Sequence, residues 1–333
     1  MTRRRFVRLA VSMPLLASAP AVALSSWAAE RLPWHGFGGA TPNDRFYVTS
    51  YGSTPKVAAS AWQLRIEGLV RSPLVIGYQD LLRLPTVNEM LTLECISNPP
   101  GGSAIGNAQW VGTKLRPLIE RAGIEPRAVA AVLEGGDGYA TGVPVEDLLR
   151  PENFIAYTMN GVPLPPDHGF PARLMIPGKY GMKQPKWLSA IRFVDRPYVG
   201  YWEARGWSQS AWRKANAGFF VPAPPSGLVS RLLGTTRLRQ PAELVGWALA
   251  GPAGVRKLEV SADGGKTWHA AELVYNASPY VWTVWRYRLA GQNPGTYTVR
   301  LRATTADGTV QPAYDDDTLN GNGGQASLTV ALQ

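Results

Sequence analysis

The sequence contains few of the residues and motifs that identify common kinds of functional site. It has one cysteine, Cys95, and three histidines, His35, His168 and His269. A lone cysteine cannot form an internal disulfide, and the absence of C-x-x-C and H-E-x-x-H spacings argues against a zinc site. No C-x-x-C-H motif is present to attach haem, and no G-x-S-x-G motif to position a hydrolase serine. The glycine-rich stretch 134–139 does not match a dinucleotide-binding fingerprint.

The excess of positive over negative charge is also small once the first residues are set aside. Charged residues make up 17% of the chain, and hydrophobic residues make up 45%, which is enough for a packed core. The formal net charge of +10 includes Arg3, Arg4, Arg5 and Arg8, and removing these leaves +6. No run rich in lysine or arginine remains, so we expect no nucleic-acid partner.

Residues 1–28 have the layout of an export signal. A basic head is followed by an apolar stretch from about residue 9 to residue 24 and then by small residues. The head also fits the twin-arginine pattern. The apolar stretch of about 16 residues is short for a membrane span, so cleavage is favoured over a retained anchor. We therefore expect a protein exported by the twin-arginine route to the periplasm or another location outside the cytoplasm.

The rest of the chain divides into two parts that differ in periodicity. Residues 30–60 are typical of an extended lead-in, and short strand and helix patterns then mix up to residue 222, as in an α+β domain. Strands are predicted over 61–70, 89–95, 128–134, 170–178 and 187–194, and short helices over 78–84, 113–123 and 143–150. Beyond the proline-rich stretch 221–227 only strand patterns occur. We expect a catalytic domain over residues 29–222 and an immunoglobulin-like β-sandwich over residues 226–333.

Cys95 stands between an apolar strand pattern and a stiff loop that contains Pro99, Pro100, Gly101 and Gly102. An isolated cysteine in a strand is most often a small buried apolar residue. It also serves as a nucleophile when a neighbouring base activates it, or as a metal ligand. The residues alone leave these three interpretations open.

A second cluster of residues suited to ligand binding lies far downstream, in residues 167–193. It combines glycines with the basic side chains of His168, Arg173, Lys179, Lys183 and Lys186. Interleaved cations and glycines are typical of a site for an anionic ligand that carries a phosphate, whereas a solvated basic face is the alternative.

Several long stretches resemble the sulfite oxidase family of molybdenum enzymes. They are LTLECISN (91–98), GTKLRPLIERAGI (112–124), DGYATGVPVEDLL (137–149), IAYTMNGVPLPPDHGFPARLMIPGKYGMKQPKWL (155–188) and GYWEARGWS (200–208). The stretch VRKLEVSADGGKTWHAAEL (255–273) is similar to the dimerisation domain of that family. The resemblance implies a sulfite-oxidase-type molybdopterin-binding domain followed by a dimerisation-type domain.

The resemblance also implies a molybdenum–molybdopterin cofactor, with one cysteine thiolate as the protein ligand of the metal. Cys95 stands at that position. Tyr139 matches the tyrosine beside the oxo group of the metal, and Arg205 matches a basic residue near the active site or pterin. The implied cofactor-binding residues are Cys95, Asn98, His168, Arg173, Lys183 and Lys186.

One departure from the family concerns the substrate. Sulfite-oxidising members follow the cysteine with arginines, in the pattern C-x-G-N-R-R, and carry another arginine in the lead-in segment. This chain has Pro99, Pro100 and Ser50 at those places. Because each charged hydrogen bond contributes about 1.5–3 kcal/mol, we expect weak capture of sulfite.

The sequence thus predicts an exported oxidoreductase that performs two-electron oxygen-atom transfer at a cysteine-ligated molybdenum centre. Its substrate is sulfite or another oxo compound of sulfur or nitrogen. The alternatives are a periplasmic reductase of S- or N-oxides and a non-catalytic binding or assembly protein. Because no haem or flavin motif is present, electrons pass through an external carrier, such as a c-type cytochrome or a quinone-linked membrane protein. The C-terminal domain is expected to form a homodimer.

Overall fold

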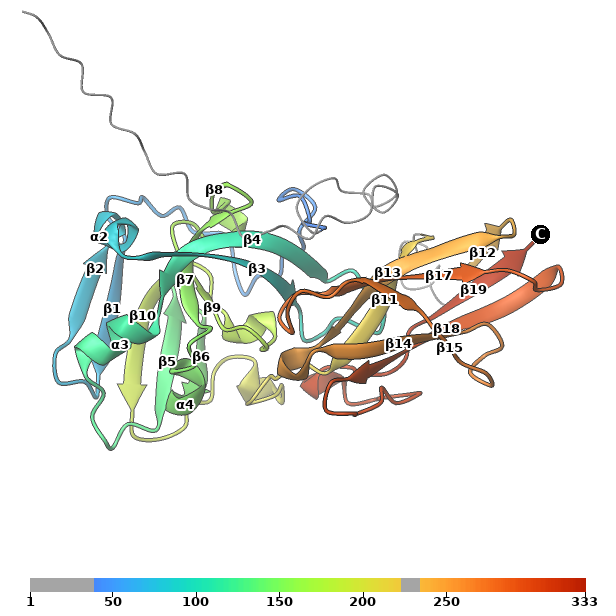
Figure 1. The fold of residues 1–333 in the computed structure, drawn as a ribbon. Coiled ribbons are helices and arrows are strands. Elements are labelled where there is room, and N and C mark those ends of the chain that lie inside the picture. The colour runs from blue at the N-terminus through green and yellow to red at the C-terminus, as the bar shows by residue number, and fades with distance from the viewer. Residues whose placement is uncertain (1–38, 223–233) are drawn as a thin grey trace, which may run out of the picture.

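The computed structural model describes residues 39–222 and 234–333 (Figure 1). The expected export signal, residues 1–28, lies outside the described residues. Strands form most of the regular secondary structure in these ranges, and the α-helices in it are only four to seven residues long. The α+β prediction is therefore confirmed in part, because the helices occur where they are predicted but the strands dominate. In the described ranges no helix is long and apolar enough to span a bilayer.

The N-terminal part contains two sheets. The first has the order β2-β1-β10-β5-β6. Its strands are β1 (Gln63–Gly68), β2 (Leu74–Gly77), β5 (Ala130–Gly135), β6 (Ala140–Pro144) and β10 (Leu188–Val194). The second has the order β3-β4-β7-β8, with β9 paired to β7. Its strands are β3 (Thr86–Glu94), β4 (Ile105–Lys114), β7 (Phe154–Met159), β8 (Val162–Pro163) and β9 (Arg173–Met175).

Local sequence explains where the helices of this part begin and end. Helix α2 (Tyr78–Arg83) stops just before Pro85, because a residue that precedes proline avoids helical geometry. Helix α3 (Arg116–Ala122) buries Leu118 and Ile119 and ends at Gly123, whose φ of 68° is the left-handed cap that glycine accepts most easily. Helix α4 (Val145–Leu148) is a single turn.

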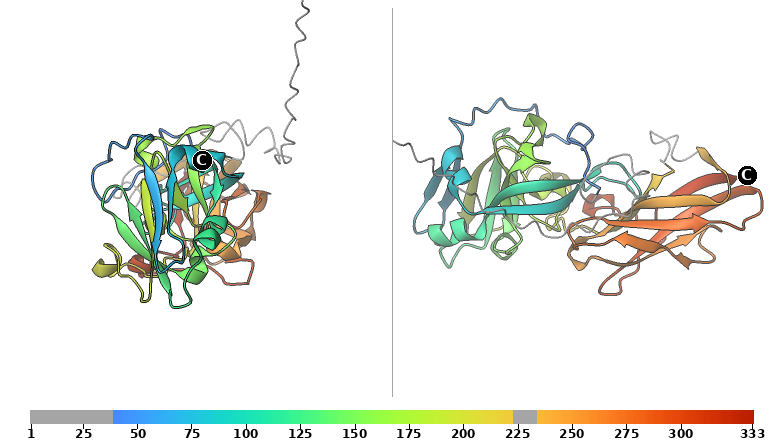
Figure 2. Two further views of the ribbon diagram at one scale, coloured as in Figure 1. Left: turned by 90° about the vertical axis from the view of Figure 1, so that its left-hand side faces the viewer. Right: turned by 45° about the horizontal axis from the view of Figure 1, so that its top comes forward.

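The C-terminal part consists of two sheets packed face to face. One sheet has the order β11-β13-β17-β16, and the other has the order β12-β19-β18-β14-β15. Their strands are β11 (Ala215–Val221), β12 (Thr235–Leu238), β13 (Ala242–Ala250), β14 (Val255–Ser261), β15 (His269–Ala270), β16 (Glu272–Tyr275), β17 (Thr283–Leu289), β18 (Gly295–Thr305) and β19 (Ser327–Leu332). Trp285, Leu258, Leu301 and Val330 belong to their shared core. Figure 1 and the right-hand view of Figure 2 show this sandwich beside the N-terminal part, so the molecule is elongated.

The sandwich begins earlier in the chain than residue 226. Strand β11 lies inside the range 29–222 that the sequence assigns to the catalytic domain, yet it pairs with β13 from Ala215 to Val221. Two glycines allow this close pairing: a Cβ on Gly246 would lie 2.0 Å from the carbonyl oxygen of Gly218, and a Cβ on Gly218 would meet the ring of Trp247. The first strand of the sandwich therefore comes directly after the last loop of the catalytic part.

The two parts of the molecule meet at the end of β3. The backbone N–H of Thr92 donates to the carbonyl of Tyr280, and the hydroxyl of Thr92 accepts from the N–H of Trp282 at 2.8 Å. Arg213 donates to the Thr92 carbonyl at 2.6 Å. Residues of the C-terminal part therefore fix the strand that leads directly into Cys95.

Candidate functional site

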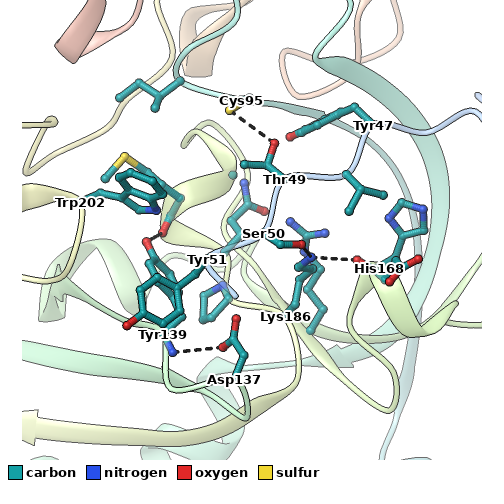
Figure 3. A pocket seen from close by; sticks show the side chains of 18 of the residues that line it. Tyr47, Thr49, Ser50, Tyr51, Cys95, Asp137, Tyr139, His168, Lys186 and Trp202 are labelled. Atoms are coloured by element: carbon teal, nitrogen blue, oxygen red, sulfur yellow. Dashed lines mark hydrogen bonds between the residues drawn. The ribbon is translucent and has the colours of Figure 1, made fainter. Parts of the chain in front are cut away.

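A cavity in the N-terminal part brings together five of the residues predicted for the site (Figure 3). They are Cys95, Tyr139, His168, Arg173 and Lys186. They come from distant parts of the chain: the loop after β3, the turn before β6, and the segment from residue 168 to residue 186. The tertiary structure therefore joins the two clusters that the sequence shows separately.

Cys95 faces this cavity from the first position after β3. Its side chain is half-buried, and its sulfur lies 3.2 Å from the Ser97 hydroxyl and 3.8 Å from the Thr49 hydroxyl. Its backbone N–H donates to the carbonyl of Ala104, and its own carbonyl accepts from the N–H of Asn98. The sulfur is thus presented to the cavity by a loop whose backbone is held by hydrogen bonds.

Asn98 shapes this loop and does not line the cavity. It is buried, donates to Glu94 Oε1 at 3.0 Å and accepts from the N–H of Ala104 at 2.9 Å. Glu94 Oε1 also accepts from Asn216 on β11 at 2.7 Å, and Asn216 in turn accepts from the N–H of Gly101 at 3.2 Å. Burial raises the pKa of Glu94, and the hydrogen bonds from the two amides oppose that rise.

Arg173, Lys186 and His168 form the positively charged side of the cavity. Arg173 on β9 is buried, its Nε has no hydrogen-bond partner among the described residues, and burial lowers its pKa to about 10. Lys186 donates to the Asp167 carbonyl at 2.9 Å and to Ser50 at 3.2 Å, and burial together with Arg173 lowers its pKa to about 8. Such a side binds anions, because an added negative charge relieves the desolvation of these cations.

His168 lies beside these cations in a turn between β8 and β9. Its Nε2 is 3.1 Å from the carbonyl oxygen of Asn43, and its ring packs edge-on against Phe46. Burial lowers the pKa of His168, and the charges of Arg173 and Lys186 act in the same direction. The surroundings therefore favour the neutral form of the imidazole.

Tyr139 closes the cavity on the side of β6. Its hydroxyl donates to the Met182 carbonyl at 2.6 Å, and its backbone N–H donates to Asp137 at 3.1 Å. Burial and then the negative charge of Glu203 raise the pKa of Tyr139 above its usual value. The phenol therefore stays protonated and can donate a hydrogen bond over the physiological pH range.

Lys183 and Arg205, two further residues predicted for the site, do not line the cavity. Lys183 is fully buried, forms an ion pair with Glu203, and donates to the carbonyl of Gly142 at 2.9 Å. Arg205 lies at the surface with its guanidinium 3.5 Å from the centre of the Tyr201 ring. Lys183 is thus paired within the protein, and Arg205 contacts Tyr201 at the surface.

Sequence reasoning missed the wall of the cavity around Cys95. This wall is mostly aromatic and hydroxyl-bearing, and its members are Tyr47, Thr49, Tyr51, Met182, Trp202 and Trp207. Residues 47–51 belong to the segment that the sequence identifies only as an extended lead-in. Tyr201, Trp202 and Trp207 lie in GYWEARGWS, whose aromatic density was the available signal. The described residues contain no cluster of three or more histidine, cysteine or acidic side chains that could hold a metal.

Comparison with known protein families gives two matches. The family described as "oxidoreductase molybdopterin binding domain" matches residues 51–202, and the family described as "Mo-co oxidoreductase dimerisation domain" matches residues 230–323. The first match includes most of the residues that line the cavity, though not Tyr47, Thr49 or Trp207, and the second match covers most of the sandwich.

Curated relatives and one solved structure extend these matches. The uncharacterized oxidoreductase YuiH of Bacillus subtilis is 33% identical over 44% of this chain and 72% of its own. Mitochondrial sulfite oxidase of Drosophila melanogaster is 26% identical over 82% of this chain and 55% of its own. NADH nitrate reductase of Solanum lycopersicum is 28% identical, and the match spans only 34% of its length. The sulfane dehydrogenase SoxCD of Paracoccus pantotrophus has the same fold, with a TM-score of 0.73 and 24% identity over 88% of this chain and 83% of its own.

Proposed function

The chain belongs to the sulfite oxidase family of molybdenum-dependent oxidoreductases, and we propose that it transfers an oxygen atom in a two-electron reaction at a metal held by Cys95. It is an oxidoreductase that uses molybdopterin-bound molybdenum. The observation that carries the proposal is the placement of the one cysteine of the chain on the wall of a cavity that also holds the buried Arg173 and the half-buried Lys186, neither of which forms a salt bridge with a carboxylate among the described residues.

The residues of the cavity fit this cofactor. A soft thiolate is a suitable ligand for molybdenum, and coordination keeps it deprotonated. The unpartnered Nε of Arg173 and the lowered pKa values of Arg173 and Lys186 are the features expected of a cradle for a phosphate. When bound, the cofactor supplies the two-electron oxygen-atom chemistry, and the protein supplies binding, orientation and electrostatics.

The side chains of the cavity have separate tasks in this proposal. Cys95 holds the metal, while Arg173, Lys186 and His168 hold the pterin and its phosphate. Tyr139, protonated because of its burial, places its hydroxyl, which donates to the Met182 carbonyl, at the cavity wall. Asn98 fixes the loop that carries the sulfur through its bonds to Glu94 and Ala104. Lys183 acts behind the cavity, where its ion pair with Glu203 holds the turn that contains Met182.

The substrate we propose is a small oxo compound of sulfur or nitrogen. Sulfite is a candidate, but we expect it to bind weakly. The expected arginine positions hold Pro99 and Pro100, which offer no charged donor and do not line the cavity. A specific observation favours the second candidate, reduction of an S- or N-oxide. The wall around Cys95 is made of Tyr47, Tyr51, Trp202 and Trp207, which suits a less charged oxide with an organic substituent.

The proposal also covers the location of the protein and its partners. The twin-arginine layout of residues 1–28 supports export to the periplasm. The chain would exchange electrons with an external carrier such as a c-type cytochrome or a quinone-linked membrane protein. The match to a dimerisation domain supports a homodimer formed through the C-terminal sandwich, which we take to be immunoglobulin-like.

The test is metal analysis combined with a Cys95→Ser variant. We expect about one molybdenum per chain in the wild type after expression in a host that makes the cofactor, and turnover with at least one member of a panel of sulfite, sulfoxides and N-oxides. Cys95→Ser should stay folded and lose turnover, whereas the surface variant Arg205→Ala should keep it. Wild-type turnover by Cys95→Ser would disprove the ligand assignment, and a wild type without molybdenum would favour the non-catalytic alternative.

A further inference from the structure

We infer that the hydroxyls of Ser97 and Thr49 donate hydrogen bonds to the Cys95 sulfur and thereby raise the reduction potential of the metal that this sulfur binds. The inference rests on the proposed function, because it takes Cys95 as the metal ligand. It goes further by assigning a task to two residues for which the family resemblance implies none.

The geometry around the sulfur supports this assignment. Ser97 Oγ lies 3.2 Å from Cys95 Sγ, and Thr49 Oγ1 donates to the same sulfur at 3.8 Å (Figure 3 shows the Thr49 contact). The two hydroxyls come from different segments, the loop after β3 and the lead-in, and both residues line the cavity. Neither hydroxyl has another hydrogen-bond partner among the described residues, so the sulfur is their common target.

Coordination to a metal fixes the direction of these bonds. A free thiol can donate or accept, but a metal-bound thiolate has no proton and can only accept. Both hydroxyls must then act as donors. A donor withdraws electron density from the sulfur, which makes the thiolate a weaker donor to the metal. The reduced metal is favoured over the oxidised metal, and the reduction potential rises.

The loop does not need these hydroxyls in order to fold. Its backbone is held by the bonds of Cys95 with Ala104 and Asn98, and by the buried amide of Asn98. Ser97 and Thr49 are both exposed. The C-x-G-N-R-R pattern of sulfite-oxidising relatives places glycine where this chain has Ser97, so the fold tolerates the absence of a side chain there. Removal of either hydroxyl should therefore leave the structure intact.

The experiment compares Ser97→Ala, Thr49→Val and the double variant with the wild type, all as full-length, molybdenum-loaded protein. The midpoint potential of the metal is measured by following its paramagnetic signal during a redox titration. We expect a lower potential in each variant, larger for Ser97→Ala because its contact is shorter. A roughly tenfold change in the equilibrium constant corresponds to 59 mV for a one-electron couple. The double variant should show about the sum of the two shifts.

Two controls separate this effect from a change in the loop. Ser103→Ala removes an exposed hydroxyl from the same loop that has no contact with the sulfur, and it should not change the potential. Ser97→Thr keeps the hydroxyl and should restore a near wild-type value. Equal shifts in Ser97→Ala and Ser103→Ala would overturn the inference.

Substrate kinetics distinguish the remaining alternative, in which the hydroxyls bind substrate. A raised KM with unchanged potential in Ser97→Ala and Thr49→Val would overturn the inference while leaving the proposed function in place. A wild-type protein that binds no molybdenum would instead overturn the proposed function, and this inference with it. Loaded variants with unchanged potentials would overturn the inference alone.

Discussion

Two groups of cations in residues 173–186, all buried except the half-buried Lys186, behave in opposite ways. Behind the cavity, Lys179 lies 2.8 Å from Asp147 Oδ2, and Lys183 pairs with Glu203. Within the cavity, Arg173 and Lys186 have no salt bridge with a carboxylate in the part of the chain that the structure describes, and the pKa of each is lowered by burial. The charges of the first group are therefore paired within the protein, whereas those of the second group are left for a ligand to pair.

This difference separates residues that hold the fold from residues that hold a ligand. A buried charge costs several kcal/mol unless it is paired, so a fold that leaves one unpaired beside a cavity must recover that cost from something that binds there. We therefore expect the first group to determine stability and the second to determine cofactor affinity. The predictions below test that division in order of decreasing expected effect.

Glu203→Ala should cause the largest loss of stability, about 3–5 kcal/mol, because it leaves Lys183 buried with no carboxylate partner. Chemical denaturation of the purified protein measures this free energy of unfolding. The double variant Lys183→Met/Glu203→Leu removes both charges and should recover much of the loss. A loss below about 1 kcal/mol in the single variant would contradict the idea that this pair holds the fold.

Arg173→Met should lower cofactor affinity by about 10–100-fold, which corresponds to one charged hydrogen bond of about 1.5–3 kcal/mol. The cofactor-free protein should be as stable as the wild type or more stable, because an unpaired buried cation has been removed. Molybdenum and pterin retained after dialysis give the affinity, and thermal unfolding gives the stability. Full retention of cofactor together with a large drop in stability would place Arg173 in the first group instead.

Lys186 should make the stability of the cofactor-free protein depend on pH. Burial lowers its pKa to about 8 in the folded state, below the value of about 10.4 expected for an unfolded chain. Between these values the unfolded chain binds more protons, so the stability of the cofactor-free protein should rise with pH over this window. Lys186→Met should remove that part of the slope. Unfolding curves collected from pH 7 to pH 10 on both proteins test it, and identical slopes would refute the shift.

Arg205→Ala should have the smallest effect, at most about 1 kcal/mol, because an exposed cation–π contact contributes little. Cofactor content should not change. Metal analysis and thermal unfolding check both expectations. A loss of molybdenum in this variant would show that Arg205 acts on the cavity, as the family resemblance implies, despite its surface position.

The sequence predicts local structure in both parts of the molecule well because local signals determine it. Leu118 and Ile119 share a helical face, and Gly123 supplies the cap, so α3 forms where the pattern predicts it. In β18 the alternation of Val299, Leu301 and Ala303 is confirmed by their burial in the sandwich core.

The division between the two groups of cations is not visible in the sequence. Lys183 and Lys186 stand in similar surroundings along the chain, but among the described residues only Lys183 forms a salt bridge with a carboxylate, that of Glu203. The same reason explains why the sequence did not predict the cavity wall around Cys95. Tyr47 and Thr49 line the cavity with this residue only because the lead-in folds across it. Long-range contacts of this kind carry no local pattern.

The position of β11 has a consequence for how such proteins can be recombined. The dimerisation-domain match begins at residue 230, after β11, although this strand is already part of the sandwich. A chimera joined at residue 230 would take its first sandwich strand from one parent and the remaining strands from another. It would also separate Asn216, which bonds both Glu94 and Gly101, from the sheet that supports it. The exchangeable module therefore begins before Ala215, and domain shuffling in this family should respect that earlier junction.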